Sequence, residues 1–308
     1  MSQSGLPSEV LVVDVSPRDG LQNEAIPVST EAKVELVRAL SAAGVRRIEA
    51  TSFVSPKAVP QMADAAEVMA RIERRPRTDY AVLVPNERGL ERALEAKADI
   101  VNIVVVATET FSRRNVNMSV AESMEQARRV AATAAASGTR RSAVLGASFH
   151  CPFEGAVPED RVLDLVGQFV DAGFIEVTLA DTIGAADPAH VARLGLAVRQ
   201  RYPSVELGIH LHDTRGLGLA NAYAAVTNGY VRLESSLAGV GGCPFAPGAT
   251  GNACTEDLVF MLESMGVATG ISLPALIESA RSMPNVVGHG ISSRMVAAGP
   301  RSVLPPPS

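Results

Sequence analysis

The chain has 308 residues, a formal net charge of −5 and 47 % hydrophobic residues, so it can bury a full-sized core, and its acidic balance argues against nucleic acid as a partner. No run approaches about 18 apolar residues, and the first residues lack the pattern of a secretory signal, so no membrane span is expected. Three cysteines do not make a disulfide framework, which favours a cytoplasmic enzyme.

Short apolar runs alternate with amphipathic segments along the whole chain. Strands are expected at 10–15, 47–50, 80–84, 100–106, 143–148, 175–179, 206–212 and 231–235. Helices are expected at 30–43, 63–72, 87–96, 120–136, 160–172, 188–201, 217–228 and 255–265, with a further one at 273–282. Sustained alternation indicates a parallel sheet, and eight units in one domain indicate an α/β fold of the (β/α)8 TIM barrel type. The alternative is an open doubly wound sheet, which usually has fewer strands.

A single structured domain is expected. Residues 1–8 are expected to form a disordered N-terminus, 9–285 the catalytic barrel, and 286–308 a C-terminal extension with a poorly ordered tail. In such a barrel the active site lies at the C-terminal ends of the strands. Polar residues that follow the apolar runs should therefore form one coherent set.

The segment Gly208–Arg215, GIHLHDTR, carries the strongest chemical signal. His210 and His212 are two residues apart, so in an extended strand their side chains point to the same face. Two adjacent imidazoles make half of a metal site, which oxygen ligands from elsewhere would complete. On this segment alone, a polar strand end with hydrogen-bonded histidines explains the pattern equally well.

Charged residues follow other predicted strands. Asp19 can supply a hard oxygen ligand, and Arg18 a permanent cation for an anionic oxygen, although a surface ion pair is the simpler alternative. Glu49 and Asp181 place carboxylates at the ends of the second and sixth strands. A carboxylate at a barrel strand end favours a catalytic or positioning role over a solvated charge.

The loop after the eighth predicted strand carries a thiol, Cys243, after three glycines. Glycines permit the movement that a loop closing over substrate needs, so a functional thiol is favoured over the usual buried cysteine. Cys151 and Cys254 have no such context and are expected to be structural. Asn252 precedes the last barrel helix and, from its position alone, is interpreted as an N-cap.

Taken together, these segments resemble 3-hydroxy-3-methylglutaryl-CoA lyase, within the wider HMGL-like family of DRE-TIM metallolyases. The resemblance covers roughly residues 10 to 285. It is carried by six stretches: Ser16–Glu24, Ala50–Asp64, Cys151–Gly155, Asp181–Gly184, His210–Thr214 and Ala238–Phe260. Such a long, ordered set of matches is more specific than a shared barrel.

The resemblance implies a divalent metal, Mg²⁺ or Mn²⁺, held by Asp19, His210, His212 and Asn252. Asn252 thus becomes a ligand instead of a cap. The implied catalytic residues are Arg18, Glu49, Asp181 and Cys243. The arginine would stabilise a developing enolate, the carboxylates would act in acid–base chemistry or positioning, and the thiol would lie on a closing loop. The expected partner is an acyl-CoA substrate, and the expected assembly is a homodimer.

The implied reaction is a metal-dependent retro-Claisen cleavage of a 3-hydroxy-3-substituted acyl-CoA, HMG-CoA or a close analogue. Its products are acetyl-CoA and a 3-keto acid such as acetoacetate. Ser142, Val144 and Arg215 depart from the family pattern, which suggests a different 3-substituent. A Claisen-condensing acyl-CoA synthase and a 2-keto acid aldolase of the same superfamily are the alternatives. A scaffold without activity would require loss of the metal and thiol positions, which are present.

Overall fold

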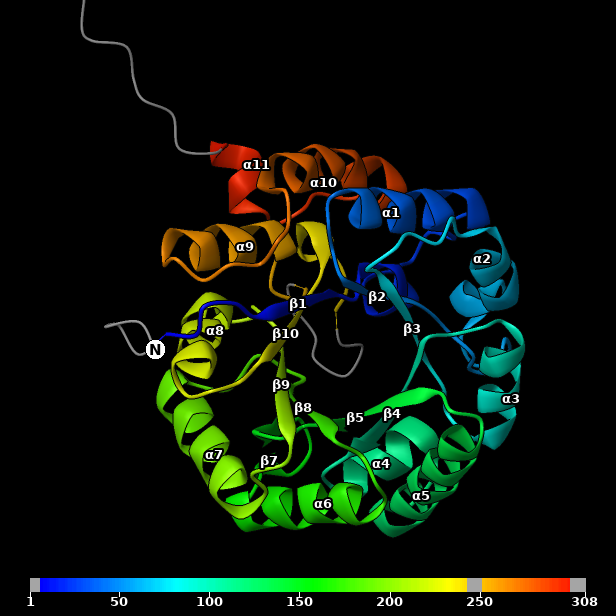
Figure 1. The fold of residues 1–308 in the computed structure, drawn as a ribbon, viewed down its shortest axis with the longest axis vertical. Helices are drawn as coiled ribbons and strands as arrows, with labels where there is room; N and C mark the ends of the chain where they lie inside the picture. The colour runs from blue at the N-terminus through cyan, green and yellow to red at the C-terminus, as the bar shows by residue number, and fades with distance from the viewer. Residues whose placement is uncertain (1–5, 243–250, 300–308) are drawn as a thin grey trace, which may run out of the picture.

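The structure, a computed structural model, describes residues 6–242 and 251–299. A closed barrel of parallel strands lies at its centre with helices around it, which confirms the predicted TIM barrel (Figure 1). The barrel strands are β1 (Leu11–Asp14), β2 (Arg47–Ser52), β3 (Asp79–Leu83), β4 (Ile100–Val106), β5 (Arg140–Gly146), β8 (Glu176–Asp181), β9 (Glu206–Leu211) and β10 (Arg232–Ser235). A small antiparallel hairpin after β5 consists of β6 (His150–Cys151) and β7 (Gly155–Ala156).

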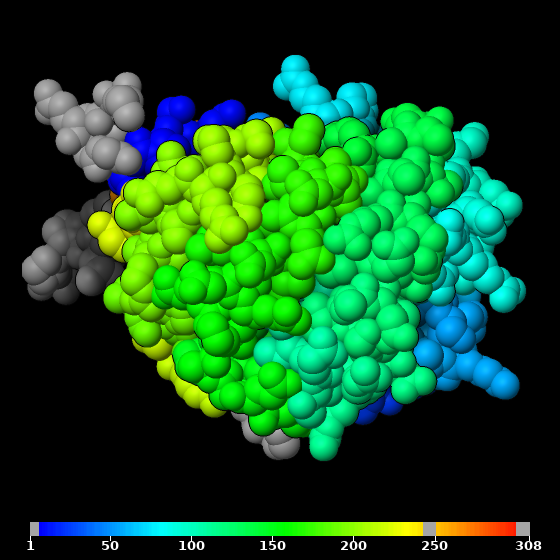
Figure 2. Space-filling view, turned by 90° about the horizontal axis from the view of Figure 1, so that it is seen from below, coloured from blue at the N-terminus to red at the C-terminus, as the bar shows by residue number. Residues whose placement is uncertain are grey.

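The helices that follow the barrel strands are α1 (Thr30–Ala42), α2 (Ala65–Arg71), α3 (Glu87–Glu95), α5 (Val120–Ala136), α6 (Glu159–Asp171), α7 (Pro188–Arg201), α8 (Gly218–Thr227) and α9 (Thr255–Ser264). Further helices are α4 (Glu109–Val116), α10 (Leu273–Val287) and α11 (Arg294–Ala298). Helices cover the barrel wall, and α5, α6 and α7 contribute to the face seen in Figure 2. Among the described residues, no helix has the length and apolar character needed to cross a membrane.

Local sequence signals set where several helices begin. Ser119 forms a capping box with Glu122 at the start of α5, so each residue satisfies a backbone N–H that the helix leaves unpaired. Asp187 caps α7 by accepting from the backbone N–H of His190, and Pro188 occupies the first turn, where no N–H is required. These signals explain why the predicted bounds of α5 and α7 agree with the structure.

Two regions add structure to the predicted pattern. The connection between β4 and α5 contains α4, whose short sequence ETFSRRNV is mostly polar. The C-terminal extension, expected from residue 286, contains the end of α10 and then α11. The carboxylate of Asp257 accepts hydrogen bonds from the backbone N–H groups of Arg294 and Met295, which anchors α11 to α9. The predicted tail beyond 299 lies outside the described residues.

Ion pairs close the barrel at the N-terminal ends of its strands, here called the N-terminal mouth. Glu176 accepts from Arg47 at 2.5 Å (Nη1 to Oε2) and lies 3.1 Å from Arg232 (Nη1 to Oε2). Arg140 donates to both carboxylate oxygens of Asp79 at 2.9 Å. The side chains of Arg47 and Arg232 are only 6 % and 3 % exposed, so these pairs compensate buried charges.

Candidate functional site

Arg18 and Asp19 lie in a π-helical turn, η1 (Ser16–Gly20), at the C-terminal end of β1. Asp14, the last residue of β1, fixes this turn by accepting from both the backbone N–H and the hydroxyl of Ser16. Its other oxygen accepts from the hydroxyl of Thr255 at 2.6 Å. Burial raises the pKa of Asp14. Such π-turns are frequent at functional sites.

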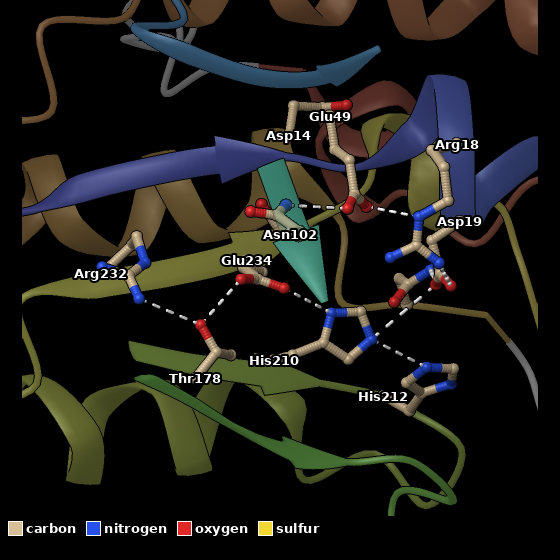
Figure 3. A network of polar contacts seen from close by, with 12 residues as sticks. Asp14, Arg18, Asp19, Glu49, Asn102, Thr178, His210, His212, Arg232 and Glu234 are labelled. Atoms are coloured by element: carbon tan, nitrogen blue, oxygen red, sulfur yellow. Dashed lines mark hydrogen bonds and ion pairs between the residues drawn. The ribbon is translucent and has the colours of Figure 1, made fainter. Parts of the chain in front are cut away.

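Arg18 lies between two carboxylates (Figure 3). Its Nε donates to Oε2 of Glu49 at 2.5 Å, and its Nη1 donates to Oδ1 of Asp19 at 2.7 Å. Asn102 donates to the other oxygen of Glu49 at 2.9 Å. Glu49 lies inside β2, which continues to Ser52, so the predicted strand end at this carboxylate is wrong.

The two carboxylates beside Arg18 differ in acidity. Burial raises the pKa of Glu49 in spite of the adjacent guanidinium. Burial also opposes the ionisation of Asp19, but the charge of Arg18, with smaller contributions from His210 and His212, outweighs it and holds the pKa of Asp19 well below its usual range. Two carboxyl groups whose pKa values are shifted in opposite directions are typical of sites that need one ionised carboxylate and one carboxyl group that carries a proton.

His210 and His212 extend from the end of β9 toward Asp19, as the strand periodicity predicts. Their Nε2 atoms lie 3.1 Å apart, and Nε2 of His210 lies 3.8 Å from Oδ2 of Asp19. Burial lowers the pKa of His212 to about 4, so its imidazole is neutral near pH 7. Burial alone would lower the pKa of His210 too, but the hydrogen bond with Glu234 and the charge of Asp19 raise it.

Asn252 enters the site from the segment before α9, where it forms an antiparallel bridge with His212. Its Nδ2 donates to Oδ2 of Asp19 at 3.0 Å and to the carbonyl of Val240 at 3.1 Å. Its Oδ1 is buried and has no hydrogen-bond partner among the described residues. The cap position of α9 belongs to Cys254, so the interpretation of Asn252 as an N-cap is wrong.

Gly241 permits this close approach. Its φ of 97° lies in the left-handed region that favours glycine, and an added Cβ would lie 2.7 Å from Cα of Gly20 and 2.9 Å from Nδ2 of Asn252. The sequence interpretation ascribed the glycines after β10 to loop movement. For Gly241, the structure gives packing of the loop against η1 as the reason.

These donors fit a divalent cation. One ligand atom from each of Asp19, His210 and His212 lies within 4.8 Å of the others, and the unpartnered Oδ1 of Asn252 is a further acceptor beside them. Mixed imidazole and oxygen donors suit Mg²⁺ or Mn²⁺ better than thiolate-rich sites do. Three carboxylates, Asp19, Glu49 and Glu234, lie close enough to Arg18 to act on its charge at the C-terminal ends of the strands, here called the C-terminal mouth. Such an excess of acceptors favours a bound cation.

Asp181 ends β8 beside this set, but its carboxylate is turned toward the following loop. Its two oxygens accept hydrogen bonds from the backbone N–H groups of Ala185 at 2.8 Å and Ala186 at 3.0 Å. Burial raises the pKa of Asp181, and these N–H groups oppose that rise. The geometry therefore gives this carboxylate a contact that orders the β8–α7 loop.

The sequence interpretation missed four polar residues of the barrel interior: Asp14, Asn102, Thr178 and Glu234. Glu234 lies on β10, where its Oε2 is 3.2 Å from Nδ1 of His210 and its Oε1 accepts from Thr178 at 2.9 Å. A signal was available for two of them, because Asn102 interrupts the apolar run IVNIVVV and Glu234 lies inside a short strand. Polar residues inside predicted barrel strands are therefore candidate interior residues.

The three positions expected to depart from the family pattern lie in two places. Ser142 and Val144 are buried on β5. Arg215 lies at the rim, where its Nη1 donates to the carbonyls of Ile183 at 2.7 Å and Gly184 at 3.1 Å. It therefore joins the loop after β9 to the loop after β8.

Two of the three cysteines lie among the described residues, and both are buried, as expected of structural cysteines. Cys151 and Cys254 are buried, and the thiol of Cys151 accepts from the hydroxyl of Thr108 at 3.1 Å. Burial raises the pKa of Cys254. Cys243, the predicted functional thiol, lies outside the described residues.

Comparison with known proteins agrees with this geometry. The HMGL-like family model matches residues 9–283. Hydroxymethylglutaryl-CoA lyase from Bacillus subtilis is 41 % identical over 288 residues, which cover 94 % of this chain and 96 % of that protein. A 3-hydroxy-3-isohexenylglutaryl-CoA/hydroxymethylglutaryl-CoA lyase from Pseudomonas aeruginosa is 42 % identical over 293 residues, or 95 % and 98 % of the two chains. An HMG-CoA lyase structure from Acinetobacter baumannii, in complex with coenzyme A and 3-methylmalate, matches with a TM-score of 0.93 and 41 % identity over 100 % of both chains. The chain belongs to the HMGL-like family.

Proposed function

We propose that this protein is a carbon–carbon lyase that cleaves 3-hydroxy-3-methylglutaryl-CoA, or an analogue with another 3-substituent, to acetyl-CoA and a 3-keto acid. The observation that carries the proposal is the donor set of Asp19, His210, His212 and Asn252 beside Arg18. Relatives that share about 41 % of its residues over nearly the full length are named hydroxymethylglutaryl-CoA lyases. A solved relative binds coenzyme A, which supports an acyl-CoA substrate.

The reaction breaks the bond between C2 and C3 of the acyl group. The 3-hydroxyl loses its proton, C3 becomes a ketone, and the bonding electron pair moves into the thioester enolate, which then takes a proton to give acetyl-CoA. Bound Mg²⁺ or Mn²⁺ supplies Lewis acidity, which lowers the pKa of a coordinated hydroxyl and polarises carbonyl oxygens. Asp19, His210, His212 and Asn252 would hold it.

Four side chains carry the remaining steps in this proposal. Arg18 offers permanent donors to the enolate oxygen, and Asp19 and Glu49 hold its guanidinium in place. Burial raises the pKa of Glu49 and of Asp181, which is the direction that favours a carboxyl group able to carry a proton. We assign protonation of the enolate carbon to the thiol of Cys243.

The identity of the 3-substituent is the second part of the proposal. Among the relatives, the Pseudomonas aeruginosa enzyme is named for both isohexenyl and methyl substrates. Ser142 and Val144 are buried on β5, beside the strands that carry the site, and Arg215 ties the rim loops. We propose that these positions select a 3-substituent larger than methyl or one that is acidic.

The test is an acetyl-CoA release assay with Mg²⁺ or Mn²⁺ on 3-hydroxy-3-methylglutaryl-CoA and on its isohexenyl and carboxylated analogues. His210→Ala and Cys243→Ala are the controls, and both should abolish most turnover. Faster cleavage of a substituted analogue supports the specificity proposal, whereas equal or better turnover of the methyl compound overturns it. Activity that survives chelation of metal, or none with any analogue, contradicts the mechanism.

We also propose that the protein acts in the cytoplasm, which its low cysteine count favours, and that it is a homodimer, as the resemblance to the family suggests. Analytical ultracentrifugation of the purified chain tests the assembly, and a monomer at assay concentration would contradict it. Fractionation of the source cells tests the location.

A further inference from the structure

We propose that Glu234 is a positioning residue that orients the His210 imidazole for metal binding. The inference rests on the metal site proposed above. Glu234 and His210 are both 7 % exposed and lie side by side in the register of β10 and β9. Oε2 of the carboxylate lies 3.2 Å from Nδ1 of the imidazole, on the opposite side of the ring from the atom that approaches Asp19 (Figure 3).

This contact determines where the imidazole carries its proton. An ionised carboxylate can only accept, so Nδ1 of His210 must be the donor in both the neutral and the protonated ring. In the neutral ring the lone pair then belongs to Nε2, the atom that lies 3.8 Å from Oδ2 of Asp19 and 3.1 Å from Nε2 of His212. Glu234 thus fixes both the orientation of the ring and the tautomer that can bind a metal.

Hydrogen bonds with other barrel residues hold the Glu234 carboxylate in place. The hydroxyl of Thr178 on β8 donates to its Oε1 at 2.9 Å, and Arg232 donates to that hydroxyl at 3.2 Å. Gly208 on β9 leaves the space for this contact, since an added Cβ would lie 2.7 Å from Oγ1 of Thr178. A chain of buried polar contacts therefore connects His210 through the barrel interior to the ion pairs of the N-terminal mouth (Figure 3).

His212 lacks the equivalent support. Its Nδ1 is buried and has no hydrogen-bond partner within residues 6–242 and 251–299. The two histidines therefore differ, although both extend from the same strand end toward the same place. Of these two histidines, only His210 has a carboxylate at its Nδ1 among the described residues. Loss of that carboxylate should therefore change the orientation and tautomer of His210 without acting directly on His212.

Glu234→Gln is the sharpest substitution, because it keeps the shape and removes the acceptor that fixes the proton. If the amide group turns its NH₂ toward His210, Nδ1 must accept, and the proton moves to Nε2. If it turns its carbonyl toward His210, the NH₂ faces Thr178, whose hydroxyl already accepts from Arg232 and then loses its own acceptor. The first arrangement puts the proton on the nitrogen that should bind the metal, and the second keeps the metal-binding tautomer only at the cost of the hydrogen bond that Thr178 donates.

The experiment measures Mn²⁺ binding by electron paramagnetic resonance and the His210 tautomer by ¹⁵N NMR. The chain has five histidines, so the imidazole signals can be assigned by substitution. We expect Glu234→Gln to weaken Mn²⁺ binding by about ten- to a hundredfold, the range known for partners of metal-binding histidines. In the metal-free protein at alkaline pH, His210 should carry its proton on Nδ1 in the wild type and lose that preference in the variant.

Glu206→Gln is the matched control, because Glu206 is exposed at the start of the strand that carries His210. It should bind Mn²⁺ as the wild type does. Thr178→Val removes the hydroxyl that fixes Glu234 and should produce a smaller loss of affinity, with the tautomer retained. Equal Mn²⁺ affinity in wild type and Glu234→Gln would overturn the positioning role alone. Failure of the wild type to bind Mn²⁺ would overturn the metal site as well.

Discussion

The two mouths of the barrel use charged residues in opposite ways. At the N-terminal mouth, Glu176 faces Arg47 and Arg232 in close ion pairs, and burial of each charge is compensated. At the C-terminal mouth, Oδ1 of Asn252 and Nδ1 of His212 are buried without a partner among the described residues. Acidic residues there surround Arg18, and burial raises the pKa of Glu49.

The ion pairs of the N-terminal mouth therefore serve stability, whereas the polar groups of the C-terminal mouth serve chemistry, although both belong to one sheet. Removing one member of a compensated buried pair leaves the other charge unpaired, so the N-terminal mouth should be sensitive in its free energy of unfolding. At the C-terminal mouth, the unpartnered Oδ1 of Asn252 and Nδ1 of His212 cost stability unless a ligand satisfies them. Matched substitutions at the two mouths should therefore change different quantities.

The largest effect is expected for Arg18→Met, with Arg140→Met as the matched change at the other mouth. Loss of the donors that face the enolate should lower kcat by about 10²- to 10³-fold, as for removal of one donor to a developing oxyanion. Arg140 is 52 % exposed and lies far from these donors along β5, so its variant should keep its activity. Acetyl-CoA release measures both, and equal losses would show that the mouths are not functionally distinct.

Glu176→Gln should have the next largest effect, on stability. The side chains of Arg47 and Arg232 would lose a counter-charge while only 6 % and 3 % exposed, which should cost about 3 kcal/mol of unfolding free energy. Urea denaturation measures this loss. The kcat of the folded variant should remain close to that of the wild type, and a large drop in kcat would contradict the division between the mouths.

Two glutamates should give the mouths opposite pH dependence. Burial opposes the ionisation of Glu176, but the hydrogen bond from Arg47 and the charge of Arg232 outweigh it and keep its pKa below the ordinary 4.5. Its contribution to stability is therefore present above pH 4.5 and is lost as the pH falls through the folded pKa. Glu256, which accepts from the backbone N–H of Ala238 after β10, has its pKa raised by burial to about 7. Its contribution is present below pH 4.5 and is lost as the pH rises toward 7.

Denaturation across this pH range checks both signs. Glu256→Gln should remove a decline in stability of about 1 to 3 kcal/mol between pH 4.5 and 7, because a tenfold change in an acid dissociation constant corresponds to about 1.4 kcal/mol. Glu176→Gln should flatten the decline below pH 4.5 and leave the upper range unchanged. If Glu256→Gln instead leaves the decline toward pH 7 unchanged, the carboxyl is already ionised in the folded protein and the interpretation of its burial fails.

The smallest effect is expected for Arg215→Ala at the rim of the C-terminal mouth. The variant loses two hydrogen bonds to the carbonyls of Ile183 and Gly184, which should change kcat/KM by less than about tenfold. The ratio of kcat/KM for the methyl substrate to kcat/KM for the isohexenyl substrate should change by more than either value alone. Arg88→Ala on α3 is the matched control, and its ratio is the reference for this change. An unchanged ratio would remove Arg215 from the specificity residues.

Much of the fold could be predicted because it depends on local periodicity. The bounds of β4, α5 and α7 follow from apolar runs and capping residues that are neighbours in the sequence. The shared direction of His210 and His212 follows from the repeat of two along a strand. By contrast, α4 was not predicted, because its eight mostly polar residues are equally typical of a connecting loop.

The sequence by itself determined the barrel, the mouth at which Arg18 and Asp19 meet the two histidines, and the family. Tertiary structure alone decided which partner each polar atom has. Asn252 donates to Asp19 across 233 positions of chain instead of capping α9, and Glu234 supports His210 from a neighbouring strand. The physical reason is that periodicity gives the direction of a side chain, whereas hydrogen bonding depends on the register between strands and on how closely their loops pack.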